Sequence, residues 1–178
     1  KNDNTWEYVQ SNENQNIDCE NSIWEKRYYV DEFKQPTEEG YIRNKSYLEG
    51  TFSNSATTNS KLNVRLLIDD DSFSMMLYEY GSMQMKDVIS TRYEISIRDA
   101  ITGDKYSFRS FESSGDRVTI RQLGNKKDFL ELIRILKIGS KYDISLKSND
   151  IVSKSYLFSF DASCFKEIFA ITSPPEIN

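Results

Sequence analysis

The sequence predicts a mainly β fold, an antiparallel β-sandwich or flattened barrel, with one helix before the last hairpin and a short C-terminal helix. The clearest observation is a period-two alternation of apolar and polar residues on both sides of an acidic turn at residues 69–72. Short alternating segments separated by turn residues then recur along the chain, as in sandwiches and barrels. The spacing becomes helical at residues 129–136, and again near the C-terminus.

The chain divides into a polar tether over residues 1–22 and a single domain over residues 23–178. The tether is rich in Asn, Gln, Glu and Ser, and Trp6-Glu7-Tyr8-Val9 interrupts it. We expect the first strand over residues 23–33, ended by Gln35-Pro36-Thr37. A second strand begins at Tyr41-Ile42 and resumes through Tyr47, Leu48 and Phe52, with Gly50 as a bulge.

The central hairpin follows a polar loop at residues 53–60, whose hydroxyls and amides should cap their own backbone. The less favoured interpretation of this loop is a contact loop for a sugar or an anion. Because alternate residues of a strand face opposite ways, Met76, Tyr78 and Tyr80 should oppose Phe73, Met75 and Leu77. Three large side chains in a row form a patch that soluble monomers seldom leave bare. We therefore predict that this interaction face is covered by the segment around Trp6–Val9 or, as the second option, by a partner chain.

The second half of the chain is predicted to contain strands around Ile95, Phe108, Val118, Ile144 and Phe158. A helix should begin after Asn125 as its N-cap and end at Gly139. A final short helix, capped by Asp161 or Ser163, should bury its apolar residues, which are Phe165, Ile168 and Phe169.

Composition bears on function chiefly through what it makes improbable. The chain has no histidine, so it lacks the commonest general base and zinc ligand, and no spacing singles out carboxylate, Lys or Tyr chemistry. We therefore expect no catalytic residues, no metal and no cofactor. The net charge of −5 disfavours a nucleic-acid partner. The acidic run at residues 69–71 lacks the spaced ligands of a calcium loop and is interpreted as a solvated turn.

Cys19 and Cys164 lie near opposite ends of the chain and lack the paired spacing of a metal or redox motif. They could form a disulfide that ties the N-terminal segment to the end of the last strand, or they could be two unrelated thiols. If the protein is exported, we expect the disulfide.

Several segments resemble a group of uncharacterised exported β-rich lipoproteins of Gram-negative gut bacteria. They are Tyr29-Val30-Asp31-Glu32-Phe33, Pro36-Thr37, Tyr41-Ile42, residues 50–60 and Leu77-Tyr78-Glu79-Tyr80-Gly81. More distantly, the helix, the glycine and the two closing strands resemble the invasion-associated locus B-like β-sandwich proteins, although the paired cysteines of that family's middle strands are missing here. The resemblance implies an exported β-sandwich, periplasmic or attached to the outer membrane, and implies no functional residues.

The predicted function is a non-catalytic binding or interaction module of the cell envelope, with an unknown protein or envelope ligand as its partner. It would meet the membrane only through an N-terminal lipid anchor, for which a polar, Asn-rich start is suited. Three alternatives remain at this point. One is a small barrel that binds an apolar ligand between its Met and aromatic faces. Another is an immunity or inhibitor protein, and the least favoured is a histidine-free enzyme that uses carboxylates.

Overall fold

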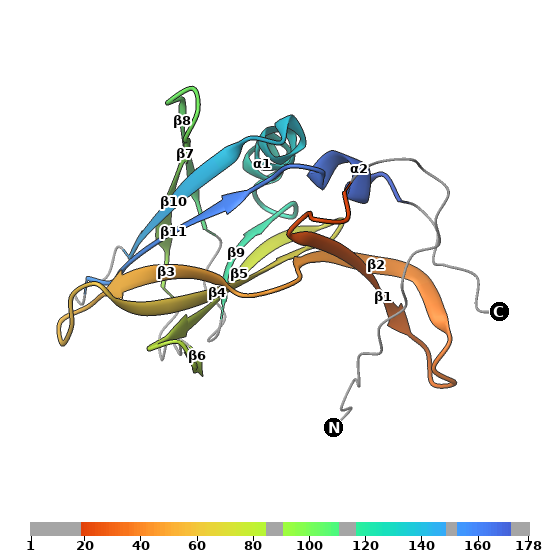
Figure 1. The fold of residues 1–178 in the computed structure, drawn as a ribbon, viewed down its shortest axis with the longest axis horizontal. Coiled ribbons are helices and arrows are strands. Elements are labelled where there is room, and N and C mark those ends of the chain that lie inside the picture. Colours follow the sequence, from red (N-terminus) through yellow and green to blue (C-terminus); the bar gives the residue numbers. More distant parts are fainter. Residues whose placement is uncertain (1–18, 85–90, 111–116, 149–152, 172–178) are drawn as a thin grey trace.

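Antiparallel strands form one strongly curled sheet in the computed structural model, which describes residues 19–84, 91–110, 117–148 and 153–171 (Figure 1). The sheet contains eleven strands in this described part, namely β1 (Trp24–Val30), β2 (Pro36–Asn44), β3 (Leu48–Ser53), β4 (Ser60–Ile68), β5 (Ser72–Glu79), β6 (Met83–Gln84), β7 (Tyr93–Asp99), β8 (Lys105–Arg109), β9 (Arg117–Arg121), β10 (Lys141–Ser148) and β11 (Ser155–Asp161). Two helices, α1 (Lys126–Ile138) and α2 (Phe165–Phe169), complete the described fold. The predicted fold class is confirmed, in the form of a half-barrel.

Strand β4 is the branch point of the sheet. One of its edges pairs with β5 along most of its length, and β5 in turn pairs with β9 and β6. Its other edge is shared, because β3 pairs with residues 60–64 while β2 pairs with Leu67 and Ile68. From β3 the sheet continues through β11, β10 and β7 to β8. The predicted central hairpin therefore joins both branches of the fold.

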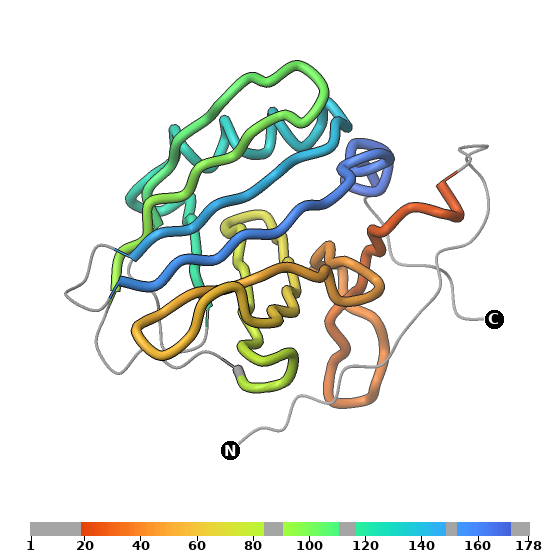
Figure 2. Tube along the Cα trace, turned by 60° about the vertical axis from the view of Figure 1, so that its left-hand side comes forward, coloured from red at the N-terminus to blue at the C-terminus, as the bar shows by residue number. Residues whose placement is uncertain are grey.

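The core lies on the inner side of the curl, where α1 packs (Figure 2). The inward residues of β4 and β5 are those that the alternation predicted, and all are buried: Leu62, Val64, Leu66, Ile68, Phe73, Met75 and Leu77. Five residues of α1 fill the space opposite them, namely Phe129, Leu132, Ile133, Ile135 and Leu136. Because this helix occupies the inner side, the half-barrel has a packed interior.

Both ends of α1 agree with the sequence. Asn125 is the N-cap residue, and its side-chain amide donates to the Asp128 carboxylate over 2.8 Å. Gly139 adopts φ +78°, and its N–H donates to the Leu136 carbonyl. The cap of α2 differs from expectation, because Cys164, and neither Asp161 nor Ser163, is the N-cap residue. Asp161 instead accepts hydrogen bonds from the backbone N–H and the hydroxyl of Ser163.

The predicted second strand, interrupted before Tyr47, is two separate strands in the structure, β2 and β3, with residues 45–47 between them. Both strands use the same edge of β4, so the chain must step from one end of that edge to the other. Gly50 is not a bulge. A Cβ atom there would lie 2.4 Å from the Leu157 carbonyl oxygen, so the glycine permits close approach of β3 to β11. The first strand is also shorter than predicted and ends at Val30.

Candidate binding face on the outer side of the sheet

The outer side of the β1-β2-β4-β5-β9 branch carries rows of side chains that alternate with the core residues. Directly opposed residues on neighbouring strands point to the same face, so the strand register defines these rows. One row runs through Glu25, Arg43, Leu67, Ser74 and Thr119. The neighbouring rows pair Arg27 with Tyr41, Arg65 with Met76 and Arg117, and Asn63 with Tyr78. These rows together carry four arginines and a single carboxylate.

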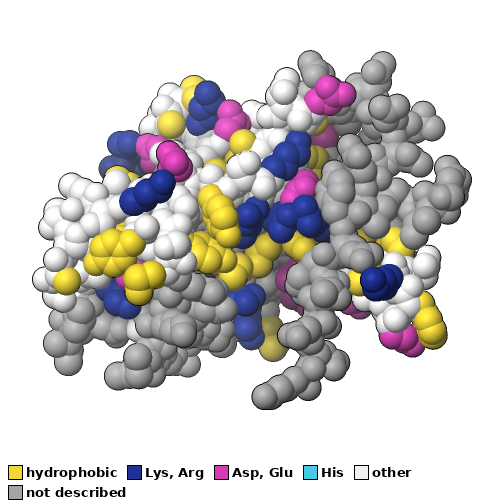
Figure 3. All heavy atoms as spheres, turned by 60° about the horizontal axis from the view of Figure 1, so that its bottom comes forward, with side chains coloured by type: hydrophobic (Ala, Val, Ile, Leu, Met, Phe, Trp, Pro, Cys, Tyr) yellow, Lys and Arg dark blue, Asp and Glu magenta, His cyan; other side chains and the backbone are white. Residues whose placement is uncertain are grey.

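We call this surface the arginine–tyrosine face and define it by seven residues from five strands and the β2–β3 connection: Arg27, Arg43, Tyr47, Arg65, Met76, Tyr78 and Arg117. Figure 3 views the molecule from below Figure 1 and shows hydrophobic and basic side chains adjoining across the middle of the visible surface. The excess of arginine contrasts with the net charge of −5 of the whole chain. Arginine and tyrosine are the residue types enriched at protein interfaces.

Aromatic rings and one guanidinium organise the centre of this face. The ring of Tyr47 meets the ring of Tyr78 edge-on, with centroids 5.1 Å apart. The guanidinium of Arg65 lies over the Tyr47 ring at 4.4 Å from its centroid. Arg65 also donates to the backbone carbonyls of Asn44 and Lys45, where β2 ends. These contacts hold Tyr47 beside β4 and β5 although it lies outside both strands.

A second group on the face links β1 to β2. The Glu25 carboxylate accepts hydrogen bonds from Arg43 over 2.6 Å and from Arg27 over 3.0 Å. Burial raises the pKa of the Glu25 carboxyl, but the two arginines outweigh this effect, so its pKa lies below the ordinary value. One negative charge thus faces two positive charges, and the group remains positive overall.

Two tyrosines extend the face along the β1–β2 hairpin. The rings of Tyr29 and Tyr41 pack with centroids 5.4 Å apart. Burial is the main cause that raises the pKa of Tyr29, and the negative charge of Asp69 adds to it, whereas Arg117 acts in the opposite direction. Tyr29 is therefore within electrostatic range of both the β4–β5 turn and the start of β9.

The structure places Met76 and Tyr78 on the strand face opposite the core residues, as the alternation predicts, but not Tyr80; that this face is an interaction surface stays a prediction. Met76 and Tyr78 are half-buried on the side opposite Phe73, Met75 and Leu77. Tyr80 has a φ of +54°, so the alternation of β5 ends before it. Its ring, 50% exposed as a residue, packs edge-on against the core residue Phe52 at 5.0 Å. The predicted cover, Trp6–Val9, lies outside the described residues.

Two residues next to Tyr80 connect the end of β5 to the far branch of the sheet. Glu79 shares the inner face with Leu62, its partner on β4. Its carboxylate accepts a hydrogen bond from the Tyr156 hydroxyl on β11 over 2.8 Å. The aromatic contact of Tyr80 therefore belongs to this inner rim and not to the arginine–tyrosine face.

Cys19 and Cys164 form a disulfide in the structure, with Cα atoms 5.8 Å apart. Their sulfurs lie with the Glu167 carboxylate within 4.8 Å of one another. Sulfurs joined in a disulfide are not the thiolates that bind zinc, so this group does not suit a metal.

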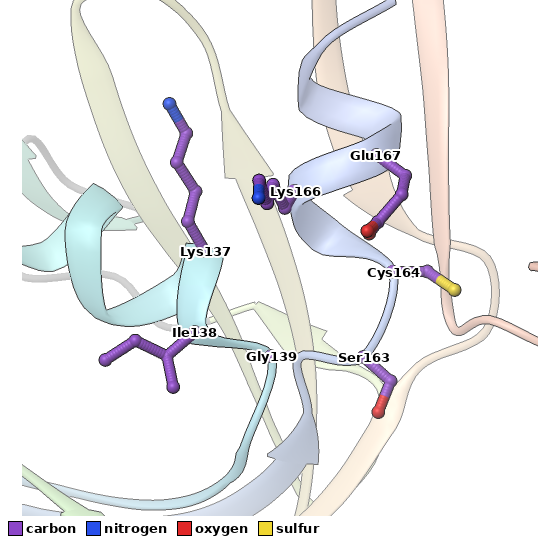
Figure 4. Close-up of a pocket in the computed structure, with 7 residues that line it drawn as sticks. All are labelled: Lys137, Ile138, Gly139, Ser163, Cys164, Lys166 and Glu167. Atoms are coloured by element: carbon purple, nitrogen blue, oxygen red, sulfur yellow. The ribbon is translucent and has the colours of Figure 1, made fainter. Parts of the chain in front are cut away.

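Next to the disulfide, the end of α1 and the start of α2 border a surface pocket of about 400 Å³. Figure 4 shows Lys137 and Ile138 pointing in different directions there, and no set of polar groups converges among the labelled residues.

The other branch of the sheet has a different outer surface. A row of small polar and apolar side chains crosses five strands, from Thr51 through Leu157, Ser145 and Ser96 to Ser107. A depression of about 190 Å³ lies at the β3–β11–β10 end of this surface. The row from Thr51 to Ser107 contains neither arginine nor an aromatic residue, so the surface around it provides residues for control variants.

The acidic run at residues 69–71 acts as a turn. The Asp69 carboxylate accepts hydrogen bonds from the backbone N–H groups of Asp71 and Ser72 and from the Ser72 hydroxyl. The polar loop at residues 53–60 also behaves as predicted. Asn54 accepts hydrogen bonds from the N–H groups of Ala56 and Thr57, and Ser53 accepts one from Asn59.

Comparison of the chain with protein-family models, with curated proteins and with solved structures finds no match. Within the described residues, neither helix has the length and apolar character that crossing a membrane requires.

Proposed function

We propose that the protein is a non-catalytic binding module of the Gram-negative cell envelope, and that the arginine–tyrosine face is its contact surface for an acidic protein partner. The observation that carries the proposal is the grouping of arginines, tyrosines and a methionine on one outer face of an otherwise acidic protein. Aromatic anchors beside arginines are the usual energetic centre of a protein interface. The excess of positive charge favours a negatively charged partner and speeds its association.

The disulfide supports the part of the proposal that concerns export. A bond between Cys19 and Cys164 persists in oxidising compartments such as the periplasm. The packed interior, in contrast, gives little support to carriage of an apolar ligand, because α1 and its neighbouring strands fill the inner side of the curl. An immunity or inhibitor role would be one form of the proposed interaction, with a secreted protein as the partner.

A photocrosslinking experiment tests the contact surface. A photoreactive amino acid replaces Met76 on the arginine–tyrosine face of the full chain, and irradiation in the native envelope captures what touches it. The matched control replaces Leu157, which is 54% exposed on the outer surface of the other branch. We expect an adduct with a second protein from position 76 that is absent from position 157.

Charge gives the second criterion of the same experiment. High salt weakens contacts between exposed charges, so the position-76 adduct should diminish as the salt concentration rises. The same adducts from both positions, or adducts insensitive to salt, would remove the face as a specific contact surface. A lipid that remains bound to the purified chain in native mass spectrometry would favour the apolar-ligand alternative instead.

A further inference from the structure

We propose that residues 1–18 of this chain dock on the arginine–tyrosine face and act as an internal competitor for its partner. The inference rests on the proposed function only in treating this face as a contact surface. Docking of the segment is a property of the isolated chain and can be measured without any partner.

Charge complementarity is the first argument. Residues 1–18 contain four acidic residues, Asp3, Glu7, Glu13 and Asp18, against one basic residue, Lys1. Among the described residues, the rows of the face contain four arginines and the carboxylate of Glu25, and the carboxylates of Asp69 and Glu39 lie at its Tyr29 edge. Glu25 is bound by Arg27 and Arg43, and the described side chains of these rows carry a net positive charge around it. The segment and the face thus attract each other across opposite net charges.

The place where the segment joins the fold is the second argument. The disulfide fixes Cys19 to the start of α2, and Ser22 donates to the Ser163 carbonyl. Between them, the Glu20 carbonyl accepts a hydrogen bond from the Lys45 side chain over 2.9 Å. Arg65 donates to the Lys45 carbonyl from the other side. The described chain therefore begins at the border of the face, where Lys45 links Glu20 to Arg65 through hydrogen bonds.

Length and side-chain type are the third argument. An extended chain spans about 3.3 Å per residue, so the thirteen residue steps from Trp6 to Cys19 reach roughly 40 Å. Neighbouring strands lie about 4.8 Å apart, so this reach exceeds the width of the five-strand branch. Trp6 and Tyr8 are the aromatic residues of the segment, and they match the half-buried Met76 and Tyr78 in chemistry. The segment can therefore place aromatic rings and carboxylates on the face together.

Acrylamide quenching of tryptophan fluorescence in the full chain tests the docking. The chain has two tryptophans, and Trp24 is 1% exposed with its indole N–H donating to the Asp161 carbonyl. Trp24 is thus shielded, and quenching reports on Trp6. A full-length Trp6→Phe variant gives the baseline of Trp24. We expect Trp6 to be quenched much less efficiently in the full chain than in a peptide of residues 1–18.

Two sets of variants identify the docking surface. Glu7→Lys with Glu13→Lys should raise the quenching of Trp6 to the peptide's value, and it leaves every described contact of the sheet in place. Asn12→Gln with Asn14→Gln is the neutral control in the same segment. Arg65→Glu with Arg117→Glu should have the same effect from the side of the sheet. Its matched control is Lys105→Glu with Lys147→Glu, which makes the same charge change on the outer surface of the other branch.

The outcomes separate the two proposals. Quenching of Trp6 in the unaltered chain that equals the peptide's value overturns the docking, whatever photocrosslinking shows. Protection that persists in Glu7→Lys with Glu13→Lys overturns docking by charge. If Trp6 is protected in the predicted manner but position 76 captures no second protein, the segment docks and the proposed partner surface fails. The competitor role itself requires that Glu7→Lys with Glu13→Lys increase the partner adduct at position 76, and an unchanged or smaller adduct overturns it.

Discussion

The side-chain oxygen of Asn44 accepts a hydrogen bond from the backbone N–H of Leu66 over 2.6 Å. The amide nitrogen of the same side chain donates to the carbonyls of Val64 and Ser46. Asn44 is fully buried at the end of β2, between the two stretches of β4 that pair with β2 and with β3. Asn44 therefore supplies the hydrogen bonds that strand pairing does not make for Val64 and Leu66, between the two stretches of β4.

Replacing Asn44 with leucine should destabilise the protein more than most substitutions at one site. The buried Leu66 N–H and Val64 carbonyl would lose their partners, at a cost of about 1–3 kcal/mol for each unsatisfied group. We expect the urea midpoint to fall with an unchanged slope. Asn63→Ala is the control, because that half-buried side chain makes one described hydrogen bond, to the Gly81 carbonyl. Equal losses for the two variants would contradict the role given to Asn44.

Gly50→Ala should weaken the joint between the two branches of the sheet. The new methyl group would meet the Leu157 carbonyl and the Phe158 Cβ at less than 3 Å, so β3 and β11 would have to separate. Overpacking of this kind costs about 1–3 kcal/mol. Compared with the unaltered protein, the variant should exchange its amide hydrogens faster at β3 and β11, and the increase at β5 and β9 should be smaller. Thr51→Ala, one residue along on the outer face, should leave that exchange unchanged.

The sequence predicted local structure well and long-range structure poorly. The β4–β5 hairpin and α1 followed from residue spacing alone, because each is built from contacts between residues near one another in the chain. That β2 and β3 are separate strands did not follow, because their separation arises from the sharing of one β4 edge by two strands. Gly50 was misread for the same reason, since its role depends on Leu157, more than a hundred residues away.

Glu25 should make stability depend on pH in the acidic range. Its folded pKa lies below the ordinary value, so its contribution is present above that ordinary value and is lost as the pH falls through the folded pKa. Glu25→Gln should therefore lower the free energy of unfolding at neutral pH and have less effect in strong acid. Urea unfolding at pH 7 and pH 3 measures both. A difference between the two proteins that is the same at both pH values would contradict the ion pairs as its source.

The disulfide should be a major contributor to stability. It joins residues 145 positions apart, and closing so long a loop in the unfolded chain is worth on the order of 4 kcal/mol. Reduction should lower the urea midpoint of the unaltered protein and leave a Cys19→Ser with Cys164→Ser variant unaffected. Thiol titration of the unfolded, unreduced protein should find no free thiol. Two free thiols would remove the bond and, with it, the support that it gives to export.

Part of the arginine–tyrosine face could have been found in the sequence. The turn at residues 69–72 places Arg65 opposite Met76 and Asn63 opposite Tyr78, so the hairpin alone predicts an arginine on this face. Arg43 and Arg117 arrive from β2 and β9, whose pairing is long-range and carries no local signal. The alternation assigns Tyr80 to this face as well. The positive φ that ends the alternation before Tyr80 is unusual for a residue other than glycine, so the sequence does not predict it.

The bond between Cys19 and Cys164 also determines how the protein responds to mechanical force. Tension applied between the two ends of the chain passes through the residues before Cys19, across the sulfur–sulfur bond, and into the residues after Cys164. All eleven described strands and α1 lie between the two cysteines in the sequence and therefore outside this path. A pull on the ends loads the residues before Cys19 and those after Cys164, which include α2, until a reductant cuts the bond; the same load then reaches the sheet.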